Sequence, residues 1–165
     1  MTGYRQDATR RVRLGLLILA APTLITGAWA VLAPASWYAD YGHGIAPPSA
    51  FGEYNEHFVQ DLGSGYLGVG AVLVCAVVWM HRQVIRAALI GFLVFTVPHL
   101  LVHVIEAGKL DRVGYLFTVG LLAVATFLSV WVWRLNDRRE TEGDQGSPDA
   151  SKVNRGDQLP PGTGA

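Results

Sequence analysis

Residues 62–80 read LGSGYLGVGAVLVCAVVWM, and residues 87–105 read AALIGFLVFTVPHLLVHVI. Neither stretch contains a Lys, Arg, Asp or Glu. A transmembrane helix needs about 20 mostly apolar residues to cross a hydrocarbon layer roughly 30 Å thick, so each stretch is long enough to span. Two further uncharged runs of sufficient length occupy residues 14–39 and 113–133. The sequence therefore predicts four transmembrane helices.

The composition agrees with a membrane location. Hydrophobic residues make up 51% of the chain and charged residues only 16%, whereas a soluble globular domain has about 25% charged residues. The net charge is zero, and the basic residues gather at the ends of the spans instead of forming the patch that nucleic-acid binding requires. Nucleic acid is therefore excluded as a partner. The single cysteine, Cys75, allows no intramolecular disulfide and reads as a small buried hydrophobe.

These features predict an all-α integral membrane protein, an antiparallel four-helix bundle in residues 1–134. The expected spans are 14–33, 57–80, 86–106 and 113–134, with an outer loop at 34–55. The first and fourth spans are expected to be mostly lipid-facing walls. Residues 135–165 are rich in Gly, Asp, Glu, Pro and Ser. Such a segment buries too little to offset its ordering entropy, which predicts a disordered cytoplasmic tail.

The distribution of arginine predicts the orientation. Arginines precede the first span, flank the turn near residue 81 and follow the fourth span, whereas residues 33–55 contain no Lys or Arg. By the positive-inside rule both termini lie in the cytoplasm. The composition, with Arg outnumbering Lys, points to a bacterial plasma membrane. An alternative treats the first span as a signal peptide cleaved near Ala28-Trp29-Ala30, but its apolar run exceeds the 7–15 residues of an ordinary signal sequence.

The outer loop is rich in aromatic residues, which are Trp37, Tyr38, Tyr41, Phe51 and Tyr54. Ser36 and Asp40 have the spacing of a short interfacial helix with a capping serine. We expect the loop to fold down over the bundle.

Ionisable residues gather near the outer ends of the second and third spans. In an antiparallel hairpin that turns near residue 81, residues whose numbers sum to about 162 lie at equal depth. The pairs at matching depth are His57 with His103, Asp61 with His99, and Glu56 with Glu106.

A helix advances 100° per residue, which places these side chains on two stripes. The stripe on the second span consists of His57, Asp61, Ser64, Gly68 and Cys75. The stripe on the third span consists of His99, His103 and Glu106, continued by Ala88 and Phe92. We expect the two stripes to face each other, with Ser64 and Gly68 allowing close approach. Pro98 is expected to kink the third span and free the carbonyl of Val94.

The first functional hypothesis is a divalent transition-metal site, because two histidines at i and i+4 on one helix face can bind one ion. Its expected ligands are His57, Asp61, His99, His103 and Glu106, with Glu56, Ser64 and Cys75 beside them. No His-Glu-x-x-His motif is present, so the zinc-protease pattern is absent.

Three alternatives remain open from the residues alone. A haem could be held between His57 and His99 or His103. A quinone or proton site could use Asp61 and His99, because a histidine beside a carboxylate can titrate near neutral pH. The polar cluster could also only fix helix packing in an accessory or scaffolding subunit.

Two motifs carry a resemblance to a known group. They are Asn-Glu-His-x3-Asp-x-Gly at residues 55–63 and Pro-His-x3-His at residues 98–103. The chain resembles small four-span actinobacterial membrane proteins that are distantly DoxX-like, over roughly residues 10–135. DoxX-like proteins include subunits associated with redox enzymes of the bacterial membrane, so the resemblance implies a membrane redox partner; a homo-oligomer is the other partner expected. Gln60 departs from the pattern, in which a basic residue is expected.

Overall fold

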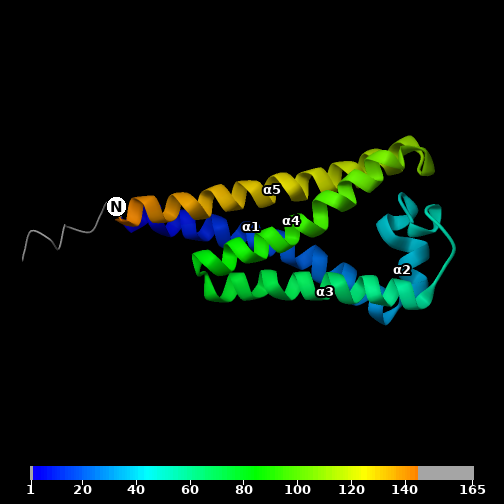
Figure 1. Ribbon diagram of the computed structural model, residues 1–165, viewed down its shortest axis with the longest axis horizontal. Coiled ribbons are helices and arrows are strands. Elements are labelled where there is room, and N and C mark those ends of the chain that lie inside the picture. The colour runs from blue at the N-terminus through cyan, green and yellow to red at the C-terminus, as the bar shows by residue number, and fades with distance from the viewer. Residues whose placement is uncertain (1, 145–165) are drawn as a thin grey trace, which may run out of the picture.

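The computed structural model describes the backbone of residues 2–144 and the side chains of residues 6–138. Within that range the chain is all-α and contains no strand (Figure 1). The elements in chain order are α1 (Thr2–Leu32), α2 (Pro34–Asp40), η1 (Tyr41–Gly44), η2 (Pro48–Ala50), α3 (Glu56–Trp79), α4 (Arg82–Ile105), η3 (Ala107–Lys109) and α5 (Arg112–Asp144).

The four long helices are apolar enough to cross a membrane. Their spanning segments are Gln6–Leu32, Glu56–Trp79, Arg82–Ile105 and Arg112–Arg138. The chain is therefore a multi-pass membrane protein built as a four-helix bundle, which confirms the predicted fold class. We call the end of the bundle that carries α2, η1 and η2 the capped end. The opposite end, with the α3–α4 turn and the starting turns of α1, is called the basic end (Figure 1).

Helix α1 forms the core of the bundle and is not the lipid-facing wall expected from the sequence. It contributes the fully buried Val12 and Leu16, which pack in one cluster with residues of α3, α4 and α5. Its spanning window is 44% buried, against 11% for that of α5. Only α5 fits the expected wall, because α1 packs between α3 and α5.

A close contact between backbones joins α1 to α3. A Cβ added at Gly27 would lie 2.9 Å from the carbonyl oxygen of Gly63, and one added at Gly63 would lie 2.9 Å from that of Gly27. Small residues allow such backbone approach in membrane helices. The expected contact of Ser64 and Gly68 with the third span is wrong. Both residues are exposed, and Gly68 has nothing within 4 Å of an added Cβ.

Helices α3 and α4 meet at the basic end and separate toward the capped end. The turn consists of Met80 and His81, and Met80 ends α3 in the left-handed conformation with φ 51°. From there α4, which contains Pro98, leans away from α3 and ends beside the start of α5 (Figure 1). The predicted turn position is confirmed, whereas the predicted tight pairing of the second and third spans is wrong.

Helix α5 continues past the end predicted for the fourth span. The side chain of Asn136 is buried, and Asp137 accepts hydrogen bonds from the Nη2 of Arg86 at 2.7 Å and from the indole Nε1 of Trp133 at 3.0 Å. These contacts hold residues 135–138 to α4, so the helix runs to Asp144 instead of ending in the predicted tail. The rest of that predicted tail, residues 145–165, lies outside the described residues.

Substitution Gly63→Ala tests the α1–α3 contact. The added methyl group meets backbone at 2.9 Å, which cannot move aside without separating the helices. Overpacking of this kind costs about 1–3 kcal/mol, so we expect lower thermal stability in detergent. Gly68→Ala is the matched control in the same helix and should stay within about 0.5 kcal/mol of wild type or gain slightly in helix propensity. Equal losses in both variants would contradict the contact.

Candidate functional site

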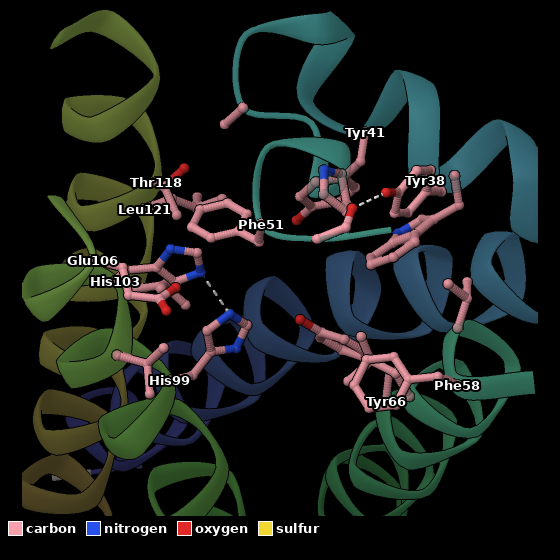
Figure 2. Close-up of a pocket in the computed structure, with 18 of the residues that line it drawn as sticks. Tyr38, Tyr41, Phe51, Phe58, Tyr66, His99, His103, Glu106, Thr118 and Leu121 are labelled. Carbon is pink, nitrogen blue, oxygen red and sulfur yellow. Dashed lines mark hydrogen bonds between the residues drawn. The ribbon is translucent and has the colours of Figure 1, made fainter. Parts of the chain in front are cut away.

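Residues 34–55, here called the cap, fold onto one end of the bundle as the aromatic loop predicted. Trp37 of α2 is 5% exposed and packs with Ala30 of α1 and Val59 of α3. Ser36 Oγ donates to Asp40 Oδ2 at 3.1 Å within the short helix. The Tyr38 hydroxyl donates to the carbonyl of Gly52 and so closes the cap on itself (Figure 2).

The cap is also fastened to the start of α5. A Cβ added at Gly114 would lie 2.3 Å from the carbonyl oxygen of Ile45, so only glycine fits between α5 and the cap. The amide of Gly114 donates to Asp111 Oδ1 at 2.7 Å, which caps the helix at the same point. The cap thus bridges from α1 and α3 on one side to α5 on the other.

A pocket of about 400 Å³ lies beneath the cap, in the space left by the separation of α3 and α4. That volume is in the range of small-molecule sites. Most of the lining is apolar and aromatic, from Trp37, Tyr41, Phe51, Phe58, Tyr66 and Phe117. The polar side chains of the lining come from several elements. Besides the tyrosines they are His99 and His103 of α4, Glu106 directly after α4, Glu53 and Asn55 of the cap, and Thr118 of α5.

The two histidines of α4 lie against each other in the pocket wall. The Nε2 atoms of His99 and His103 are 2.9 Å apart, and the rings stack with centroids separated by 4.8 Å (Figure 2). Phe51 of the cap meets His103 edge-on at 4.9 Å, and Phe95 meets His99 edge-on at 5.8 Å. Helical spacing brings the histidines together, and aromatic rings fix their orientation.

The two imidazoles keep some hydrogen-bonding atoms that a ligand can use. A neutral imidazole has one N–H and one lone pair. At 2.9 Å one Nε2–H donates to the other Nε2, so the accepting ring carries its hydrogen on Nδ1. The pair is therefore left with one Nδ1 donor and one Nδ1 acceptor.

Glu106 lies at the mouth of the same wall and is joined to η3. Its Oε1 accepts from Lys109 Nζ at 2.9 Å. The same ammonium lies 5.8 Å from the ring centroid of Phe51. The ion pair therefore sits beside the ring that covers His103.

The structure separates the predicted site residues into two groups. His99, His103 and Glu106 share the pocket, as their common stripe predicted. His57 and Asp61 do not line it. They form their own pair at 3.4 Å on a surface of α3, with side chains 88% and 67% exposed. The expectation that the two stripes face each other is wrong, because the glycine contact with α1 turns that face of α3 away from α4.

The accompanying residues of α3 also lie elsewhere. Glu56 and Ser64 are exposed, with Ser64 Oγ bonded to the carbonyl of Gln60 at 2.9 Å, and Cys75 is partly buried further along the helix. Among the described residues, no three His, Cys, Asp or Glu side chains are arranged to hold a metal ion. The five-residue ligand set is therefore not assembled, and His57 does not face His99 or His103 across the pocket.

The sequence analysis missed Tyr66, a polar residue that faces α4 from the α3 wall of the pocket. Tyr66 of α3 lines the pocket opposite His99, and its ring meets Phe95 edge-on at 4.8 Å (Figure 2). Its hydroxyl makes no hydrogen bond to the part of the chain that is described. The available signal was a tyrosine inside a span, where its hydroxyl needs a partner.

Comparison of the chain with protein-family models, with curated proteins and with solved structures found no match. The fold and the pocket therefore define the class of this protein by themselves. It is a four-span membrane protein with an aromatic pocket beneath a capping loop. The DoxX-like resemblance stays a prediction.

Tyr38→Phe tests how the cap is held. The variant loses the hydrogen bond to Gly52, which is worth about 1 kcal/mol, so residues 41–55 should exchange amide hydrogens faster and be cleaved faster by protease. Tyr54→Phe is the matched control, because Tyr54 packs on Tyr38 at 5.2 Å but its hydroxyl bonds nothing among the described residues. Unchanged exchange in Tyr38→Phe would show that the cap is held by other contacts.

Proposed function

We propose that this protein binds a quinone-class molecule of the bilayer in the pocket beneath the cap. A quinone is a flat ring with a carbonyl acceptor at each of two opposite edges and an apolar tail. The observation that carries the proposal is the pairing of an aromatic, mostly apolar pocket with hydrogen-bonding groups on two opposite walls. Ligand pockets typically combine an apolar lining with a few polar groups that fix orientation.

The polar groups match both redox forms of such a ring. His99 and His103 together offer one donor and one acceptor on the α4 wall, and Tyr66 offers a hydroxyl on the α3 wall. A quinone oxygen accepts from these groups, and the corresponding quinol hydroxyl also donates. The buried indole N–H of Trp37, which has no partner among the described residues, is a further donor in the pocket lining.

The tail has a route to the lipid. Phe58 of α3 and Val102 of α4 line the pocket and are 66% and 50% exposed. They mark a lateral opening where α3 and α4 have separated. An amphipathic ligand would keep its ring under the cap and its tail between these helices.

This proposal keeps the quinone alternative over the haem and scaffold alternatives, but without its predicted Asp61, which is exposed and does not line the pocket. His57 lies outside the pocket and supplies no second axial ligand for a haem at His99. The His99–His103 hydrogen bond runs within α4 and fixes no contact with α3. The distribution of arginine supports a further proposal, that the protein lies in a bacterial plasma membrane with both termini in the cytoplasm. The DoxX-like resemblance supports a membrane redox enzyme as its partner.

Binding of decylubiquinone to the purified chain in detergent tests the proposal, read from tryptophan fluorescence quenching and thermal stabilisation. Tyr66→Phe should weaken binding about 3- to 10-fold, the worth of one hydrogen bond. Val102→Phe, which narrows the opening, should weaken it at least as much.

Each of the two substitutions has a matched control. Leu101→Phe adds the same ring one residue away on α4, at a position that is 56% exposed and does not line the pocket. Tyr115→Phe removes a hydroxyl from α5 outside the pocket. Both should bind like wild type. Equal binding of decanol and decylubiquinone would contradict the proposal, since the pocket would then recognise only an alkyl chain.

A further inference from the structure

The ring nitrogen atoms of His99 and His103 that face each other have the arrangement of a pair of metal ligands. Both are Nε2 atoms, they lie 2.9 Å apart, and they belong to residues four apart on one helix. Two such nitrogens are the donors of a two-histidine metal chelate. We propose that His99 and His103 form a bidentate site for a divalent copper or nickel ion, with the remaining coordination positions open to the pocket.

The separation of the nitrogens selects the geometry. With metal–nitrogen bonds of about 2.0–2.1 Å, a spacing of 2.9 Å corresponds to an N–metal–N angle of about 90°. A tetrahedral zinc ion would need the nitrogens about 3.3 Å apart at the same bond length. An angle near 90° suits the square-planar or tetragonal sites of Cu(II) and Ni(II), and Cu(II) also leads the general order of affinity.

Metal binding requires only that one imidazole hydrogen moves from one ring nitrogen to the other, and no proton leaves the site. In the metal-free pair one Nε2–H donates to the other Nε2, so one ring already carries its hydrogen on Nδ1. When the second ring shifts its hydrogen from Nε2 to Nδ1, both Nε2 lone pairs face the ion and both rings stay neutral. No oxidation or reduction is involved.

The surroundings hold the two imidazoles in place. Glu106, one turn beyond His103, lines the same pocket, and Lys109 Nζ at 2.9 Å balances its charge. Phe51 and Phe95 meet the two imidazoles edge-on and hold their orientation, which reduces the ordering that binding requires. The described part of the chain supplies two ligands, so water or a pocket ligand completes the proposed coordination. This site differs from the five-ligand set expected from the sequence, because His57 and Asp61 take no part.

The test uses the full chain without an affinity tag of histidines, purified in detergent and titrated with Cu²⁺ alone. Wild type should bind one equivalent, and its electron paramagnetic resonance spectrum should show coupling to two nitrogen atoms. His99→Ala and His103→Ala should each weaken binding at least about tenfold, since loss of even a supporting group typically costs 10- to 100-fold.

His57→Ala is the matched control, because His57 also has a carboxylate partner four residues away but lies exposed on α3. It should bind within about twofold of wild type. Loss of binding in His57→Ala, or unchanged binding in either α4 variant, would overturn the proposal. If the α4 variants fail to fold, the electron paramagnetic resonance spectrum of the wild type tests the proposal. Coupling of Cu²⁺ to fewer than two nitrogen atoms would overturn the two-histidine site. Val102→Phe should keep Cu²⁺ binding while binding decylubiquinone more weakly, so a failure of one proposal can be distinguished from a failure of the other.

Discussion

The backbone contact between Gly27 of α1 and Gly63 of α3 is the constraint on which the rest of this structure depends. It leaves no room for a side chain and so fixes the rotation of α3 about its own axis. With Gly63 turned to α1, His57 and Asp61 point to the outside of the bundle. Helix α4 is left to pack on α5, and a space opens between α3 and α4 at the capped end.

That space explains the chemistry of the site. The cap covers it with aromatic rings, and α4 contributes two histidines that are hydrogen-bonded to each other. A pocket lined in this way binds flat apolar groups and orients them through a few polar atoms. The Nε2 atoms of the two imidazoles share a hydrogen bond at 2.9 Å, and the proposed metal site rests on this contact. The contact of Phe51 with His103 couples the cap to this pair.

The sequence predicted the parts of the fold that depend on one segment at a time. The lengths of the uncharged stretches predicted four spans, and helical spacing placed His99, His103 and Glu106 on one face. It could not predict the rotation of α3, because Ser64 and Gly68 satisfied the small-residue rule as well as Gly63 did. The assumption that consecutive spans pack tightly then placed His57 opposite His103. The extension of α5 to Asp144 depends on Asp137 meeting Arg86, a contact between segments distant in the chain.

The most direct test of this account is a double-mutant cycle on unfolding stability in detergent. Phe51 and His103, each changed to Ala singly and together, should show a coupling energy of about 0.5–1.5 kcal/mol, as aromatic pairs do. The pair His57 and His103, treated in the same way, should be additive within about 0.3–0.5 kcal/mol. Coupling between His57 and His103, with none between Phe51 and His103, would contradict the account.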